Sequence, residues 1–114
     1  MLTIDSLREY GANVDEGLQR CMNNEGFYLK MVAKILDDTS CEKLEKALKE
    51  NDLDAAFEAA HALKGVTANL SLTPIYEPVC EITELLRGRT QTDYSPYLEK
   101  IIEKKNELTA LSAD

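Results

Sequence analysis

One histidine and the residues around it are the part of this sequence best suited to chemistry. His61 is the only histidine in 114 residues, and Lys64 and Gly65 follow it after one helical turn. A neutral imidazole is a competent nucleophile near neutral pH, and a lysine one turn away can pair with the oxygens of a phosphoryl group on the ring. We expect no other basic residue nearby. This combination indicates phosphoryl chemistry at His61.

The helical phase of this segment predicts that His61 faces solvent. Leu63 belongs to a buried stripe of apolar residues at three- and four-residue spacing. His61 lies two residues before Leu63, which corresponds to about 200° of helix rotation and places it on nearly the opposite side of the helix. Glycine in a helix lowers its stability by roughly 1 kcal/mol relative to alanine, so Gly65 needs an explanation. One explanation is that it leaves room for an approaching protein. A tight helix contact is the alternative for Gly65, as burial in the core is for Phe57. The face expected to dock a partner carries Phe57, Gly65, Ala68 and Asn69.

Helical periodicity extends over almost the whole chain, and no run of β-branched residues alternates with period two. We therefore predict an all-α fold in which four longer helices and short N-terminal pieces form a bundle. The segment 25–37 is expected to be the first bundle helix. The expected helices cover residues 4–10, 15–22, 25–37, 39–50, 53–69, 73–87 and 95–111.

Local signals mark the ends of these helices. Gly11 can close the first one, and Asn51 or Asp52 can cap the helix that carries the histidine. The run Thr39–Glu42 fits a capping box. Thr73-Pro74 and Ser95-Pro96 each fit a cap followed by proline in the first helical position, and Pro78 predicts a kink or a later start.

Length and charge restrict the classes of function. The chain is long enough for one domain, residues 1–114, with a core of its own. Its net charge of −8 opposes binding to nucleic acid and to anionic lipid. No apolar run reaches membrane-spanning length, and the N-terminus does not resemble a signal peptide. We expect a cytoplasmic protein that is a monomer.

The cysteines give no clear sign of a disulfide framework or a metal site. There are three, Cys21, Cys41 and Cys80, widely spaced and without a C-x-x-C pair. Three reduced thiols are the simplest interpretation. A zinc site formed with His61 is an alternative, although structural zinc sites usually draw their ligands from close pairs.

The run His61-Ala62-Leu63-Lys64-Gly65-Val66-Thr67-Ala68-Asn69-Leu70 resembles the motif of histidine-phosphotransfer (HPt) domains. The stretches 57–60 and 26–30 and the overall length are also similar to that family. The chain departs from the family at two positions, where Val66 replaces a residue that is often small and Ser71 replaces a glycine. These departures concern the local helix end and the choice of partner more than the chemistry.

The resemblance implies an up-and-down four-helix bundle in which His61 is phosphorylated, Lys64 stabilises the phosphoryl group and Gly65 leaves space for a receiver domain. It implies, as partners, receiver domains of response regulators or hybrid sensor kinases. The protein would have no cofactor of its own, and the receiver would hold a magnesium ion. Consistent with a phosphocarrier that is not an enzyme, the chain has no glycine-rich phosphate loop or other ATP-binding motif.

Three further hypotheses differ from a phosphocarrier. A helical module that binds receivers or other signalling proteins without being phosphorylated would keep its function when His61 is replaced. A metal or redox protein would use the cysteines. An independent enzyme has the least support, since no paired carboxylates or nucleophile and base can be assembled around one histidine.

Overall fold

The computed structural model describes residues 1–113, and within them all regular secondary structure is helical. The all-α prediction is therefore confirmed. Each expected helix is present, with ends within two residues of the prediction. The helices are α1 (Ile4–Tyr10), α2 (Val14–Arg20), α3 (Glu25–Ile35), α4 (Ser40–Lys49), α5 (Leu53–Asn69), α6 (Thr73–Arg87) and α7 (Ser95–Ala113).

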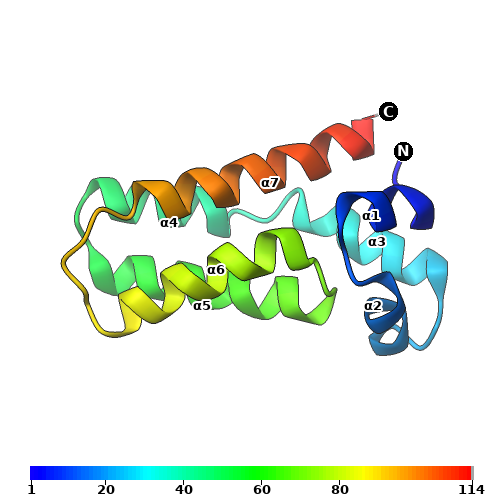
Figure 1. Ribbon diagram of the computed structural model, residues 1–114, viewed down its shortest axis with the longest axis horizontal. Helices are drawn as coiled ribbons and strands as arrows, with labels where there is room; N and C mark the ends of the chain where they lie inside the picture. The colour runs from blue at the N-terminus through cyan, green and yellow to red at the C-terminus, as the bar shows by residue number, and fades with distance from the viewer. Residues whose placement is uncertain (114) are drawn as a thin grey trace.

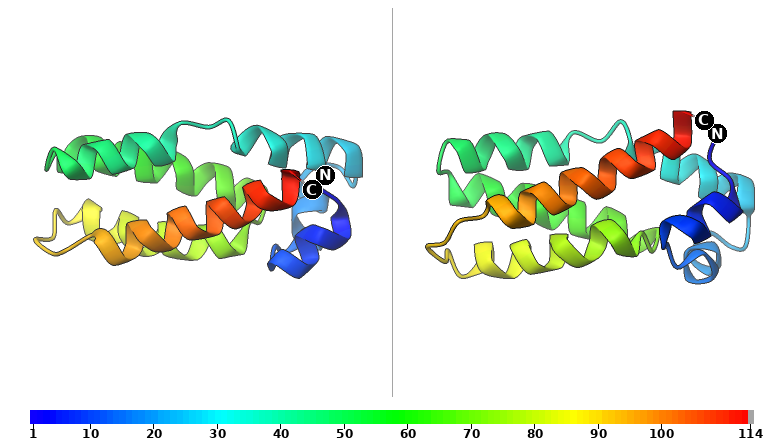
Figure 2. Two further views of the ribbon diagram at one scale, coloured as in Figure 1. Left: turned by 90° about the horizontal axis from the view of Figure 1, so that it is seen from above. Right: turned by 45° about the horizontal axis from the view of Figure 1, so that its top comes forward.

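The bundle consists of α4, α5, α6 and α7, which run up and down along one long axis (Figure 1). Each of the four packs on its neighbour in sequence, and α7 also touches α4. The prediction that segment 25–37 is the first bundle helix was wrong. Helix α3 lies beyond the end of α4 and extends the molecule lengthwise (Figure 2), because a short non-helical link interrupts the chain after Ile35.

Apolar side chains from all parts of the chain form one continuous core. Helix α5 contributes small residues, among them Ala56 and Ala60, which let the neighbouring helices approach closely. Larger side chains from the other helices fill the space, each contributing about 1.5–3 kcal/mol when fully buried. Those with almost no exposed surface include Leu44, Leu72, Ile75, Ile82, Leu86, Ile101 and Leu108. Helix α5 is thus fixed on one side and free on the other.

The start of α4 differs from the predicted capping box. Thr39 is the N-cap residue, but its side chain makes no capping hydrogen bond. The Ser40 amide instead donates to Asp38 Oδ1 at 2.7 Å. Glu42 turns away and pairs with Lys105 at 3.2 Å, and hydrogen bonds from its own amide and from Lys105 lower the pKa of its carboxyl. The Glu42 carboxylate therefore pairs with Lys105 of α7 and does not complete the predicted capping box with the Thr39 amide.

Helices α6 and α7 begin at the residues that were predicted to cap them. Thr73 and Ser95 are the first helical residues and not caps, so each proline stands in the second position. The cap of α7 comes from Asp93, whose carboxylate accepts the Ser95 amide at 2.9 Å, and these hydrogen bonds lower the pKa of Asp93. Pro78 interrupts nothing: α6 continues through it to Arg87.

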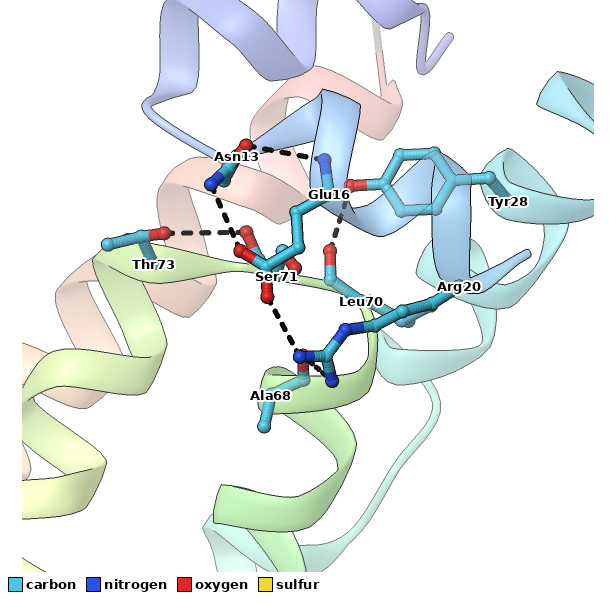
Figure 3. A network of polar contacts seen from close by, with 8 residues as sticks. All are labelled: Asn13, Glu16, Arg20, Tyr28, Ala68, Leu70, Ser71 and Thr73. Carbon is cyan, nitrogen blue, oxygen red and sulfur yellow. Dashed lines mark hydrogen bonds and ion pairs between the residues drawn. The ribbon is translucent and has the colours of Figure 1, made fainter. Parts of the chain in front are cut away.

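Helices α2 and α3 are fastened to the turn between α5 and α6 (Figure 3). The Tyr28 hydroxyl donates to the Leu70 carbonyl at 2.9 Å, and the Asn13 amide donates to the Ser71 carbonyl at the same distance. Gly17 lies so close to Tyr28 that a Cβ there would be 2.6 Å from the ring. Within residues 1–113, none of the helices combines the length and apolar character needed to cross a bilayer.

Candidate functional site

His61 lies on the exposed side of α5, as its helical phase predicts. Leu63, two residues later, is 4% exposed and faces the core, whereas His61 is among the exposed residues. The N-terminus of this helix is capped by Asp52, whose carboxylate accepts a hydrogen bond from the Ala55 amide. Of the two predicted caps, Asn51 and Asp52, the structure thus has Asp52. The ring of His61 is therefore presented to solvent on a rigid element.

The ring of Phe57 forms a platform for His61. The two ring centroids are 5.7 Å apart and the planes are inclined by 18°, which is a stacked arrangement. Phe57 is half-buried and also packs against the core. Phe57 thus contacts the core, as one of its two explanations predicts, and also stacks on the imidazole, while its docking role stays a prediction. Stacking restricts the orientations of the His61 ring.

Lys64 is held by an acidic residue of the next helix. Its Nζ lies 3.9 Å from Glu84 Oε1, and its side chain is 30% exposed. The second carboxylate oxygen of Glu84 lies 3.4 Å from Arg87 Nε. Two cations therefore share one carboxylate beside the histidine.

The expectation that no other basic residue lies nearby was wrong. The guanidinium groups of Arg87 and Arg89 lie 5.2 and 5.3 Å from the centroid of the Phe57 ring. Arg89 is anchored by Asp54 at 2.7 Å and by the Leu86 carbonyl. Sequence spacing could not reveal these arginines, because they come from the end of α6. The only available signal was that α5 and α6 form a hairpin, which brings the end of α6 back to the first turns of α5.

The surface over Gly65 is open. A Cβ built on this residue would meet no atom within 4 Å outside its own helix backbone and chain neighbours. A tight contact between helices therefore does not explain the glycine. Two turns after His61, Asn69 is exposed, while Ala68 is half-buried and its carbonyl accepts a hydrogen bond from Arg20 at 3.2 Å.

The family model for the Hpt domain matches residues 37–114, which is more than half of the chain. The chain belongs to the HPt family. Members of this family take part in histidine phosphotransfer in phosphorelays. No curated protein and no solved structure matches this chain.

The matched part of the HPt domain begins just before α4 and includes the whole bundle. It contains His61 and every residue proposed for docking. Helices α1 to α3 lie outside it, and so does the stretch 26–30 that resembles the family in sequence. The match therefore rests on the four bundle helices.

The departure of this HPt domain at Ser71 has a local structural consequence. Ser71 has a φ of 53°, in the left-handed region that glycine adopts without steric cost and other residues adopt with strain. It directly follows Leu70, the residue that closes α5. The departure concerns the helix end, ten residues beyond His61. Val66, the other departure, is half-buried in α5.

The three cysteines are free thiols. Cys21 and Cys41 are buried and Cys80 is half-buried, and burial raises the pKa of Cys41. Among residues 1–113 no three side chains of histidine, cysteine, aspartate or glutamate come together in a way that could hold a metal ion.

Proposed function

We propose that this HPt domain carries a phosphoryl group on His61, receives it from a receiver-domain aspartate and passes it to the aspartate of another receiver. The observation that carries the proposal is the geometry around one ring: His61 is exposed, stacked on Phe57, followed one turn later by a cation, and flanked by open space at Gly65. Apart from the side of Phe57 that packs on the core, this arrangement has no role in the core, and a partner's approach would account for it.

The transfer needs only one nucleophile from this chain. The unprotonated ring nitrogen of His61 attacks the phosphorus of an aspartyl phosphate, the N–P bond forms, and the P–O bond breaks as the aspartate leaves as a carboxylate. In the second transfer a carboxylate oxygen of the next receiver attacks the phosphorus and the nitrogen leaves with its electron pair. Lys64 pairs with the phosphoryl oxygens in both transfers.

The rest of the machinery belongs to the partner. In this proposal the receiver would hold a magnesium ion that would neutralise charge on the phosphoryl group, and this chain would supply no cofactor and no nucleotide site. Phosphoryl transfer depends mainly on in-line positioning and charge stabilisation, and a docked receiver provides both. In this proposal the protein is a phosphocarrier and not an enzyme.

Phe57, Gly65, Ala68 and Asn69 form the docking surface around His61 in this proposal. They lie on one side of α5, where the small residues allow a receiver to approach the ring. We further propose that residues 1–114 act as one domain, since the core is continuous from Leu7 to Leu108, and that the protein works as a cytoplasmic monomer that binds response regulators or hybrid kinases.

A transfer assay tests the proposal. The purified protein is incubated with magnesium and several phosphorylated receiver domains, and intact mass measures acid-labile, alkali-stable phosphate. We expect phosphate on the wild type and none on His61→Gln. The variant keeps a polar side chain on the exposed face of α5, so its fold, checked by circular dichroism, should be unchanged. Binding of receivers without transfer to either protein would instead favour a non-phosphorylated interaction module.

A further inference from the structure

Three charged residues from two helices meet at the level of His61. Lys64 on α5 pairs with Glu84 on α6, and Phe57 on α5 lies under Arg87. Helices α5 and α6 are antiparallel, and His61 lies in sequence between Phe57 and Lys64. The helical turn Glu84–Arg87 is therefore level with His61. The carboxylate of Glu84 lies between Lys64 and Arg87, beside the ring that carries the phosphoryl group in the proposed function.

Glu84 is bound loosely to both cations. Its oxygens are 3.9 Å from Lys64 Nζ and 3.4 Å from Arg87 Nε, longer than a good charge-assisted hydrogen bond, and its side chain is 61% exposed. Exposed pairs of this kind are weak and exchange partners readily. A phosphoryl group carries more negative charge than a carboxylate and offers three acceptor oxygens. It therefore competes well with Glu84 for the same two cations.

We propose that Glu84 is a positioning residue that holds Lys64 and Arg87 beside His61 in the unphosphorylated protein and gives them up when the phosphoryl group arrives. This inference rests on the proposed function. It assigns Arg87 as a second cation for the phosphoryl group, after Lys64. It also assigns Glu84 a regulatory effect: because its charge repels the phosphoryl group and competes for the cations, Glu84 lowers the equilibrium occupancy of His61 and favours onward transfer.

The equilibrium constant for exchange between this protein and a receiver tests the inference. Measured with free proteins at low concentration, the constant depends on the two separate molecules and not on how they dock. We expect Glu84→Gln to raise the share of phosphate on His61 by about two- to fivefold at low salt, the range for removing one exposed ion-pair partner. The effect should shrink at high salt, which screens exposed charges.

Matched variants separate this effect from a change in fold or net charge. Glu103→Gln, on an exposed residue of α7, makes the same charge change and should leave the constant unaltered. Lys64→Ala and Arg87→Ala should each lower the occupancy of His61, and Glu84→Gln should have a smaller effect once both cations are removed, because only the direct charge repulsion then remains. Phosphate on His61 with equal constants for wild type and Glu84→Gln would overturn the inference alone. Absence of phosphate from His61 in the wild type would overturn the proposed function.

Discussion

The site at His61 combines an exposed ring with fixed surroundings. Phe57 limits the tilt of the imidazole by stacking at 5.7 Å, and Arg87 and Arg89 cover the Phe57 ring. These contacts place three cations, counting Lys64, near one face of a protein whose net charge is −8. Each of these cations is paired with a carboxylate, Lys64 and Arg87 with Glu84 and Arg89 with Asp54. In the proposed function the phosphoryl group would compete with these carboxylates for the cations.

Gly65→Ala separates the docking role of this glycine from its effect on stability. A Cβ at this position meets no atom within 4 Å, so alanine should raise the free energy of unfolding by roughly 0.5–1 kcal/mol through its higher helix propensity. Transfer from a receiver should slow by about fivefold or more, since a methyl group forced into a packed contact costs about 1–3 kcal/mol. Urea unfolding and a timed transfer assay measure the two effects.

Gly26→Ala is the matched control for this variant. Gly26 is also exposed in a helix, where a Cβ would meet its nearest atom, an oxygen of Asn24, at an ordinary 3.5 Å. It should gain stability without slowing transfer. Equal transfer rates for wild type and Gly65→Ala would contradict the docking role, whereas phosphorylation by phosphoramidate, a small donor that needs no docking, should be the same in both.

At the scale of single elements, helix α5 and the turn after it carry the surface proposed to be functional. The helix is capped by Asp52 and ends at Asn69, and the chain turns sharply through Ser71 into α6. Ser71 adopts a φ of 53°, and its buried hydroxyl has no hydrogen-bond partner within residues 1–113. A serine in this position stores strain at the end of the helix that presents His61.

Ser71→Gly should stabilise the protein. Glycine adopts a positive φ without the steric cost of about 1–2 kcal/mol, and part of that gain is offset by its greater freedom in the unfolded chain. We expect the free energy of unfolding to rise by about 0.5–1 kcal/mol, measured by urea denaturation. Ser71→Ala keeps the strain while removing the hydroxyl and should therefore be less stable than the glycine variant. The opposite order of the two variants would show that backbone strain is not the main cost at Ser71.

At the scale of the whole molecule, the N-terminal helices close one end of the bundle. The first residue lies beside the end of α7, where the Met1 amino group donates to the Leu111 carbonyl at 3.2 Å (Figure 1). Tyr28 reaches from α3 to Leu70, and Arg20 reaches from α2 to Ala68 (Figure 3). The turn that ends the His61 helix is thus held by α2 and α3, which lie outside the matched family region.

Gly17→Ala should weaken this attachment. The new Cβ would lie 2.6 Å from the Tyr28 ring and 2.9 Å from the Leu70 carbonyl, and the carbonyl is backbone that cannot move aside freely. We expect a loss of about 1–2 kcal/mol in unfolding free energy, net of the gain in helix propensity. Hydrogen exchange should show the loss of protection first in α1 to α3. An alanine as stable as wild type would mean that Tyr28 relaxes without cost.

The Tyr28 phenol makes the same attachment sensitive to alkali. Burial raises the pKa of Tyr28 to about 12, and the nearby Cys21 adds to the rise. A raised pKa means that the folded state favours the protonated phenol, so this stabilisation is complete below the unfolded pKa of about 10 and is lost as the pH rises through the folded value. In urea unfolding between pH 9 and about 12, wild type should lose more stability than Tyr28→Phe.

The stability of Tyr28→Phe at neutral pH is the reference for this comparison. Tyr28→Phe removes the hydrogen bond to Leu70, which lowers stability by about 1–3 kcal/mol at neutral pH because a buried carbonyl loses its partner. The pH-dependent part is separate from that constant loss. Burial also raises the pKa values of Tyr10 and Tyr94, so the variant keeps some alkaline sensitivity. Parallel curves for the two proteins would exclude Tyr28 as the titrating group.

The sequence by itself determined the helical segments and the exposure of His61. Both depend on local rules. Apolar spacing defines the buried side of a helix, and His61, two residues from Leu63, lies on the opposite side regardless of what the helix packs against. The same rules placed Phe57 and Lys64 one turn from the ring. Local chemistry was less reliable where a side chain had a choice of partners, as at Glu42, which pairs with α7 and not with the start of its own helix.

Only the tertiary structure decided what lies across from α5. Arg87 and Arg89 reach Phe57, and Glu84 reaches Lys64, because of the register between two antiparallel helices. Tertiary packing also placed α3 outside the bundle, although its apolar face resembles that of a bundle helix. Register and docking are set by the packing of side chains from distant segments, a sum of many weak contacts that the spacing of residues along one helix does not contain.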